Sequence, residues 1–390
     1  MGIKNEENYN FIYNSFKGDV RVDVISEKPK EAAHALLKVS SDDRFPIRFA
    51  YQYGTGLIKE NNVSKRDNNI LGTFLSIRYD DIDGYISFFN EYGFLFELEN
   101  DRFIKVEIND IVQIAKRIKA LINLINCINE SPTNNNITNI FELSISLIFD
   151  SGWSIEINKN EIRTQAKYHI NDLLERPDSY ASERQLSRDE TLNGIIKVKD
   201  TIYGEYNLSS SDYRKIMSET HQKEGYNDPL FIDLTYLYTN YTSADIESRL
   251  FIDCLFHYYY EIAIPKQISL CEKPEYYTAP KAKIEDKLKQ AIVTFGKRVI
   301  TNEINQMIER IKPIYNSEKM QPDWRIDSLL SALYFSIFYM DSTMEMYRRC
   351  AHCGTLFLVK RSSSTKKFCS SYCRNNYQQA KHRLKIKQQA

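Results

Sequence analysis

Four cysteines near the end of the chain constrain its fold more than any other feature of the sequence. Cys350 and Cys353 form a C-x2-C pair, fifteen residues follow, and Cys369 and Cys373 form a C-x3-C pair. Two close pairs in this order are typical of a small metal-binding module. Four thiolates complete the tetrahedral shell that Zn2+ prefers and leave no open position for a catalytic water. We therefore expect one structural zinc ion; the alternatives are four buried thiols or two disulfides.

The residues around the cysteines predict how this module is built. Gly354 directly follows the first pair and suits the positive φ angle that a tight turn requires. Cys369 is expected just before a helix and Cys373 in its first turn, with Ser370 or Ser371 as the capping residue. A knuckle, a hairpin and a helix in this order are the plan of a treble-clef finger. The residues expected to form its small core are Phe357, Leu358 and Phe368.

Charge is divided unevenly along the chain. From Met346 to Ala390 there are eleven Lys or Arg and no Asp or Glu, which leaves 41 basic against 52 acidic side chains in the rest of the chain. The net charge of the whole chain is zero, but the C-terminal segment is cationic and the rest of the chain, which we call the body, is acidic. Such an end suits phosphate groups, although a solvated surface is the plain alternative. We expect nucleic acid, DNA in particular, to bind through the hairpin residues Lys360, Arg361, Lys366 and Lys367 and the helical stripe Arg374, Gln378, Lys381 and Lys385.

The terminal run CxxCGxxF…FCSxxCRxxY resembles a zinc finger found at the C-terminus of many bacterial proteins. The CGNR-type finger of stress-induced transcription regulators is one relative, and the ligand spacing is also similar to that of small zinc-binding inhibitors of DNA gyrase. The resemblance covers about the last 45 residues, and after Cys373 this chain reads Arg374-Asn375-Asn376 where the CGNR pattern has Gly-Asn-Arg. The first resemblance implies DNA binding and transcription regulation, and the second implies gyrase binding.

The rest of the chain predicts an α+β body that is mostly helical. Apolar residues recur at helical spacing over 111–128, 250–262, 283–311 and 329–344. Alternating runs typical of half-buried strands lie at 20–24, 103–108, 153–157 and 195–206. Pro265 and Pro313 are expected to end two of the helices.

Two positions are expected to separate domains. The polar segment 131–138 contains a proline and predicts a loop, and the cationic cysteine segment begins near residue 347. The expected division is an N-terminal α+β domain at 1–138, a mainly helical domain at 139–346, and a four-cysteine zinc finger with a basic C-terminal helix at 347–390.

No strong catalytic motif is present: the sequence has no P-loop, no G-x-S-x-G and no H-E-x-x-H. Arg163 and His169 stand in an R-x5-H relation that resembles the motif of HEPN-type ribonucleases, in which the two side chains act on the RNA phosphate. A surface helix that carries both by chance is the better interpretation. His257 is expected to be a hydrogen-bonded core histidine. We therefore expect no catalytic residues and favour a non-enzymatic role.

The sequence also bears on the compartment. Cys127, Cys254 and Cys271 lack paired spacing and are expected to be buried thiols in a reducing environment. The first residues lack the apolar core of a signal peptide, and no stretch of about 18 uncharged apolar residues could span a membrane. We expect a cytoplasmic protein with no membrane partner.

The function that these features favour is that of a bacterial zinc-finger DNA-binding regulator. Its acidic body is expected to sense a signal, self-associate or dock a protein partner. The alternative is an adaptor of a bacterial stress or phage-defence system whose finger binds protein, and a HEPN-like ribonuclease toxin is the weakest candidate. Steeply salt-dependent binding by the finger indicates the first function, whereas salt-tolerant capture of a protein indicates the second.

Overall fold

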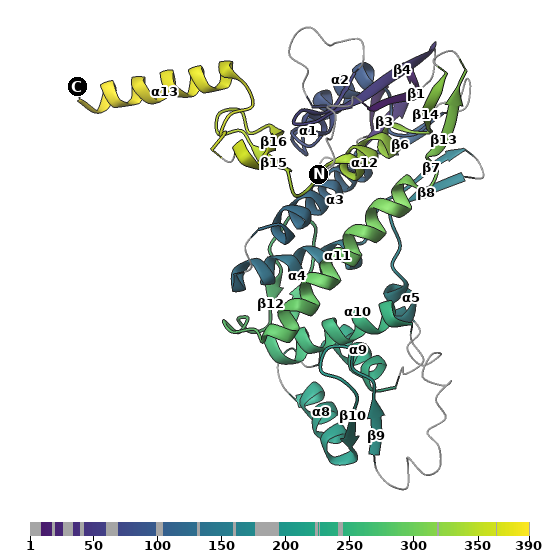
Figure 1. The fold of residues 1–390 in the computed structure, drawn as a ribbon, viewed down its shortest axis with the longest axis vertical. Coiled ribbons are helices and arrows are strands. Elements are labelled where there is room, and N and C mark those ends of the chain that lie inside the picture. The colour runs from purple at the N-terminus through teal and green to yellow at the C-terminus, as the bar shows by residue number, and fades with distance from the viewer. Residues whose placement is uncertain are drawn as a thin grey trace. The chain divides into compact units, whose positions relative to one another are not determined.

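The computed structural model of this chain combines long helices with small sheets (Figure 1). It describes residues 9–17, 20–25, 34–39, 43–59, 69–98, 104–130, 133–158, 161–175, 195–222, 225, 227–240, 245–317, 320–363 and 365–389. Helices predominate among the described residues, so the expectation of a largely helical α+β fold is confirmed. Contacts group the chain into two units, which are Met1–Ile122, Gly152–Gln165 and Glu303–Ala390 in unit 1, and Asn123–Ser151 and Ala166–Asn302 in unit 2.

Unit 1 is built on a mixed sheet that joins the start of the chain to residues more than 300 positions later. β1 runs parallel to β14, whereas all other neighbouring strands of this sheet are antiparallel. The five strands, in their order across the sheet, are β13 (Lys312–Asn316), β14 (Gln321–Ile326), β1 (Tyr9–Lys17), β4 (Asp43–Gln52) and β5 (Gly56–Lys59).

Smaller sheets and helices complete unit 1. The further strands are β2 (Val20–Ile25), β3 (His34–Val39) and β6 (Ile104–Glu107) in one sheet, and the hairpins β7 (Ser154–Asn158) with β8 (Glu161–Thr164) and β15 (Glu345–Arg349) with β16 (Leu356–Lys360). The helices are α1 (Ile70–Phe74), α2 (Ile82–Tyr92), α12 (Leu329–Tyr339), α13 (Ser371–Gln389) and the 3-10 turn η3 (Arg361–Ser363). Helices α3 (Ile108–Ile128) and α11 (Asp286–Ile308) contribute residues to both units.

Unit 2 consists mainly of helices. They are α4 (Asn134–Phe149), α5 (His169–Glu175), α8 (Ser210–Gln222), α9 (Pro229–Asn240), α10 (Ile246–His257) and the π-helical turn η2 (Tyr258–Ile262). Two short hairpins accompany them, β9 (Ile195–Val198) with β10 (Tyr206–Ser209) and β11 (Pro265–Gln267) with β12 (Glu275–Tyr276). The π-helical turn ends before Pro265, as the sequence predicts.

Several expectations about element boundaries are wrong. The strand expected over 195–206 is the hairpin β9–β10, and α11 ends at Ile308 whereas Pro313 lies in strand β13. The loop expected over 131–138 is already helical from Asn134, because the Thr133 hydroxyl accepts a 3.2 Å hydrogen bond from the Asn136 amide and caps α4. The helix expected over 329–344 ends at Tyr339, and the chain then enters strand β15. The expected division into domains at 138 and 346 stays a prediction.

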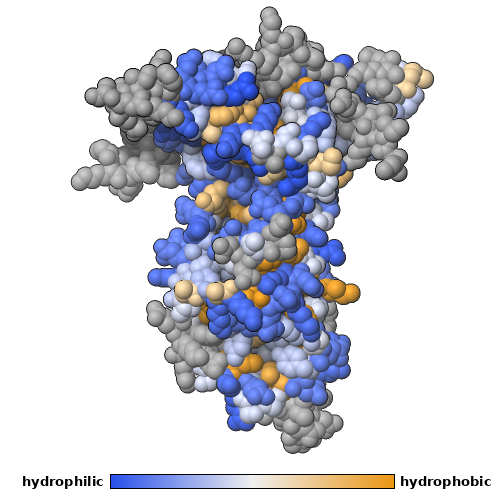
Figure 2. Space-filling model, turned by 60° about the vertical axis from the view of Figure 1, so that its left-hand side comes forward, coloured by the Kyte–Doolittle hydropathy of each residue, from blue (hydrophilic) through white to orange (hydrophobic). Residues whose placement is uncertain are grey.

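Figure 2 shows one face of the molecule, on which hydrophilic residues surround small and separate hydrophobic areas. Apolar side chains are gathered inside instead, and residues Leu329–Ile337 of α12 are all buried. No helix among the residues that the structure describes is long and apolar enough to cross a membrane.

Candidate metal centre and cationic surface

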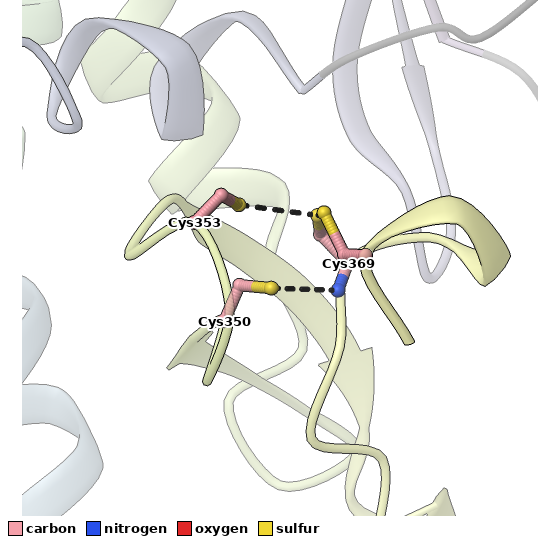
Figure 3. Close-up of side chains that lie close together, drawn as sticks. Cys350, Cys353 and Cys369 are labelled. Carbon is pink, nitrogen blue, oxygen red and sulfur yellow. Dashed lines mark hydrogen bonds between the residues drawn. The ribbon is translucent and has the colours of Figure 1, made fainter. Parts of the chain in front are cut away.

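The four cysteine thiols of the terminal segment converge on one point. Figure 3 shows Cys350, Cys353 and Cys369 pointing toward one another. All four Sγ atoms lie within 4.8 Å of one another. The Sγ of Cys369 is 3.6 Å from that of Cys353 and 3.5 Å from that of Cys373. All seven cysteines of the chain are free, and no other group of three or more His, Cys, Asp or Glu within the described ranges could hold a metal ion. The thiols are therefore arranged to bind a metal ion, as the spacing predicts.

Local hydrogen bonds shape the loop that carries the first two ligands. The chain leaves β15 at Cys350, whose amide donates a 2.9 Å hydrogen bond to the carbonyl of Thr355. The amide of Gly354 donates to the carbonyl of Cys350 at 2.9 Å, and Gly354 has the expected positive φ of 75°. This tight turn brings Cys350 and Cys353 to the same side of the loop.

The second pair of ligands lies at the start of α13. Cys369 precedes the helix and Cys373 is in its first turn, as expected. The hydroxyl of Ser370 accepts a 3.2 Å hydrogen bond from the amide of Cys373, so Ser370 is the capping residue.

The electrostatics of the thiols favour a bound cation. Burial would raise the pKa of Cys350, but backbone N–H groups that point at its sulfur, including that of Cys369 at 3.4 Å, outweigh burial and lower this pKa to about 6. Burial and the neighbouring cysteines instead raise the pKa of Cys369 above its ordinary value. Four adjacent thiolates repel one another, and a metal cation removes that repulsion.

A small apolar core supports the ligands, with one difference from the expectation. Phe357 and Val359 of β16 pack with Cys350 and Cys373, and Phe368 packs against this cluster. Successive side chains of a strand point to opposite faces. Leu358 is therefore buried on the other face of β16, so the prediction that it belongs to the core of the finger is wrong.

That other face of β16 packs against α1 of unit 1. The approach is so close that a Cβ atom on Gly72 would lie 2.1 Å from the carbonyl oxygen of Leu356. The amide of Leu356 also donates a 2.9 Å hydrogen bond to the hydroxyl of Ser76. The cysteine module is thus joined to the body through a packed backbone contact that requires glycine.

Strand β15 is held to the body by buried polar side chains. The carboxylate of Glu345 accepts hydrogen bonds from the Tyr51 hydroxyl at 2.6 Å and from the amide of Gly54. The side-chain amide of Asn69 donates to the hydroxyl of Tyr347 at 3.0 Å. None of these residues was identified from the sequence, since the segment before Cys350 continued the helical spacing of the preceding residues.

Two of the basic residues expected to bind nucleic acid have intramolecular partners. The Lys360 ammonium lies 4.4 Å from the centre of the Tyr53 ring. The Arg361 guanidinium donates a 2.9 Å hydrogen bond to the carbonyl of Ser342. Both side chains are partly buried, and they fasten the hairpin to neighbouring segments of unit 1.

Three other predicted basic residues come together around one surface hollow. Lys366, Lys367 and Arg374 line it together with the hydroxyl-bearing residues Thr365, Ser370 and Ser371. The hollow has a volume of about 490 Å³, and all three basic residues are exposed. No carboxylate is among the described residues that line it. The structure therefore gathers cations from the hairpin loop and from the helix into a single concave site beside the metal ligands. We call it the outer hollow.

Helix α13 continues past Arg374 to Gln389 (Figure 1). Tyr377, Gln378, Ala380 and Lys381 are all exposed, although the Tyr377 ring lies 5.2 Å from that of Phe368. Ala380 is therefore not part of the metal core, because the helix leaves the core after its first turns. The side chains of Leu384 and Lys385 lie outside the described part of the chain.

The remaining sequence candidates have structural partners. Arg163 lies in strand β8, not on a helix, and forms ion pairs with Glu161 at 3.0 Å and Asp327 at 3.6 Å. His169 begins α5 and is 3.7 Å from Asp172. The surface helix expected to carry both Arg163 and His169 is therefore absent. The cysteines outside the metal centre differ from expectation in part, because Cys254 is buried whereas Cys271 is exposed.

His257 is a buried and hydrogen-bonded histidine, as the sequence predicts. Its two ring nitrogens lie against the carboxylates of Asp200 and Glu261 in unit 2.

Comparison with known proteins gives no closer identification. No protein-family model matches this sequence, and no curated protein or solved structure matches it. What can be said of function therefore rests on the metal centre and the surface around it.

Proposed function

We propose that residues 345–389 form a zinc finger of the treble-clef type. Its support is the thiol geometry, since four sulfurs about 2.3 Å from a tetrahedral Zn2+ lie about 3.8 Å apart. Two of the present separations are 3.5 and 3.6 Å. Cys350 and Cys353 lie in the turn of the hairpin β15–β16, and Cys369 and Cys373 lie at the start of helix α13, so a hairpin knuckle and a helix supply two ligands each. With four protein ligands the zinc ion would be structural, and its chemistry there would be to hold the knuckle on the start of α13.

We further propose that this finger binds nucleic acid, with DNA as the target of a transcription regulator. The observation that carries the proposal is the outer hollow, in which Lys366, Lys367 and Arg374 meet without a carboxylate. Phosphate oxygens are bound in proteins by such combinations of cations and hydroxyl groups. The positive end of the α13 dipole points to the same place and favours an anion there.

The exposed residues of α13 that follow support the same proposal. Gln378 and Lys381 are exposed on α13, and the sequence beyond Lys381 adds Arg383, Lys385 and Lys387. The exposed residues from Gln378 to Lys381 are mostly polar, so burial of an apolar face does not explain them. Phosphates along a nucleic-acid backbone supply a partner of opposite charge. The residues before Met346 include more acidic than basic side chains, so this part of the chain repels the nucleic-acid backbone.

The test is charge reversal in the outer hollow of the full-length protein. Lys367→Glu combined with Arg374→Glu should weaken binding to a labelled oligonucleotide at least about tenfold, measured by fluorescence anisotropy. The matched control is Lys105→Glu with Lys312→Glu, which makes the same change of charge at two exposed lysines of β6 and β13. Each variant should keep about one zinc per chain, because neither pair supplies a metal ligand.

The outcomes separate the two classes of function. Loss of binding in the hollow variant alone supports nucleic-acid recognition. Equal binding by both variants, or no binding by the wild-type protein, favours the adaptor, in which the finger contacts protein. A regulator predicts further that binding weakens steeply with salt, whereas an adaptor contact through apolar surface tolerates salt.

A further inference from the structure

A second hollow lies beside the outer one, on the side where the finger meets the body. We call it the inner hollow; its volume is about 590 Å³. Thr55 of the β4–β5 turn, Thr73 of α1 and Ile77 beyond α1 line it from the body, and Leu356 and Phe357 of β16 line it from the finger. It therefore exists only because the finger is docked on the body.

The two hollows are adjacent, and we refer to them together as the groove. Lys366, Cys369 and Ser370 line both of them. The Lys366 ammonium lies 5.6 Å from the centre of the Phe357 ring, and Phe357 is itself part of the inner lining. This contact holds a cation at the junction of the hollows. A ligand whose anionic group sits in the outer hollow can thus continue into the inner one.

The two ends of this groove differ in chemistry. The outer hollow offers three cations, whereas Lys366 is the one basic or acidic side chain, metal-binding thiols aside, among the described residues that line the inner hollow. Inner-hollow residues otherwise offer hydroxyl groups, the amide of Asn69 and apolar surface. Such a lining offers a phosphate group little positive charge to bind. It suits a nucleobase, because the faces of a base are apolar and its edges carry hydrogen-bond donors and acceptors.

We propose that this groove binds a single-stranded segment of nucleic acid, with phosphates in the outer hollow and an unpaired base in the inner hollow. The inference rests on the proposed function and narrows it to one kind of ligand. In a duplex the bases are stacked and paired, so a base reaches a hollow only if it leaves the stack. An intact duplex therefore occupies the outer hollow alone and binds more weakly than a single strand.

The first experiment needs only the wild-type protein loaded with zinc. Three labelled probes of about twelve nucleotides are compared at one salt concentration. They are a single DNA strand, the blunt duplex of the same sequence, and a strand of abasic residues that keeps the sugar–phosphate backbone. The single strand should bind about tenfold more tightly than the duplex and the abasic strand, since one stacked base contributes an effect of that size.

A second experiment uses a variant to test whether the unpaired base lies in the inner hollow. Thr73→Glu places a carboxylate in the inner hollow and should weaken single-strand binding about tenfold, while duplex binding changes less than about threefold because the charge is screened at the outer hollow. The control is Thr301→Glu on α11. Thr301 is exposed, and its hydroxyl donates to the carbonyl four residues earlier at 2.9 Å, as the Thr73 hydroxyl does at 3.0 Å. This control should bind every probe as the wild type does.

Two results would overturn the inference and leave the proposed function standing. One is a wild-type protein that binds the abasic strand or the duplex as tightly as the single strand. The other is a Thr73→Glu protein with its full zinc content and unchanged single-strand affinity. If the wild-type protein binds none of the three probes, the proposed function itself fails.

Discussion

The Tyr51 hydroxyl donates a 2.6 Å hydrogen bond to the carboxylate of Glu345, a residue 294 positions later in the chain. Both side chains are buried, and burial together with the adjacent carboxylate raises the pKa of Tyr51 far above its ordinary value. Tyr51 lies near the end of β4, where it pairs with Leu57 of β5, and Glu345 begins β15. This bond therefore fixes the hairpin that leads into the metal ligands on the main sheet of unit 1.

Removal of this hydroxyl should destabilise the protein. Tyr51→Phe leaves the buried carboxylate of Glu345 with one donor fewer, and a hydrogen bond to a charged group contributes about 1.5–3 kcal/mol. Urea titration of the metal-loaded protein should show a loss of that size in the free energy of unfolding. Tyr315→Phe is the control, because Tyr315 is 63 % exposed, and it should change the same quantity by less than about 0.5 kcal/mol. Equal stability of the two variants would show that the Tyr51 bond is not needed to hold β15.

A second buried network lies in unit 2 around His257. Its Nε2 is 2.5 Å from a carboxylate oxygen of Asp200, and its Nδ1 is 2.6 Å from one of Glu261. The Tyr238 hydroxyl donates to the same Asp200 oxygen at 2.6 Å. Burial alone would lower the pKa of His257, but the hydrogen bonds and charges of the two carboxylates outweigh it and raise this pKa to about 9.

This histidine makes stability depend on pH. Its folded pKa lies above the ordinary value of 6.5, so its contribution is full below about pH 6.5 and is lost as the pH rises through about 9. The shift corresponds to about 3 kcal/mol. The difference in free energy of unfolding between wild type and His257→Gln should therefore shrink by about that amount between about pH 6 and pH 10. A difference that stays constant over this range would show that His257 is not held protonated.

Asp200 makes the stability of the fold depend on pH in the acid range. Burial would raise its pKa, yet the hydrogen bonds from His257 and Tyr238 lower it from 3.8 to about 2. Its contribution is therefore present above about pH 3.8 and is lost as the pH falls through about 2. Acid unfolding of the wild type should set in at lower pH than that of Asp200→Asn, as circular dichroism can measure.

The metal assignment predicts a change in composition. The purified protein should contain about one zinc per chain, and Cys369→Ser should release it because the remaining three thiolates no longer close the shell. Cys271→Ser is the control, since Cys271 is an exposed cysteine outside the cluster, and it should retain the zinc. Elemental analysis measures both. Zinc that survives the Cys369 substitution, or an iron–sulfur absorption band in the wild type, contradicts the assignment.

The metal centre could be predicted from the sequence because its geometry is local. All four ligands lie between Cys350 and Cys373, and the signals that shape them, Gly354 and Ser370, are direct neighbours of ligands. Turn and capping preferences act over a few residues and can be read without knowledge of the fold. The long amphipathic helices α3 and α11 were predictable for the same reason.

Contacts between distant segments could not be predicted in this way. The parallel pairing of β1 with β14 joins Phe11 to Trp324, and no local pattern specifies such a partner. Met340 and Met344 have helical spacing, yet the helix ends at Tyr339 and Glu345 pairs with Tyr51 instead. Tertiary contacts outweigh local propensity at such places. The inner hollow was missed for this reason, because Thr55, Thr73 and Ile77 become neighbours of the finger only in the fold.

The most direct test of the account is the salt dependence of duplex DNA binding. About five phosphate contacts predict a slope of about −4 to −5 for the logarithm of the binding constant against the logarithm of salt concentration. Lys367→Gln with Arg374→Gln removes two contacts, so the slope should become shallower by about 1.8. The same pair of substitutions at Lys105 and Lys312 should leave the slope unchanged. A hollow variant with the slope of the wild type would contradict the claim that the outer hollow binds phosphate.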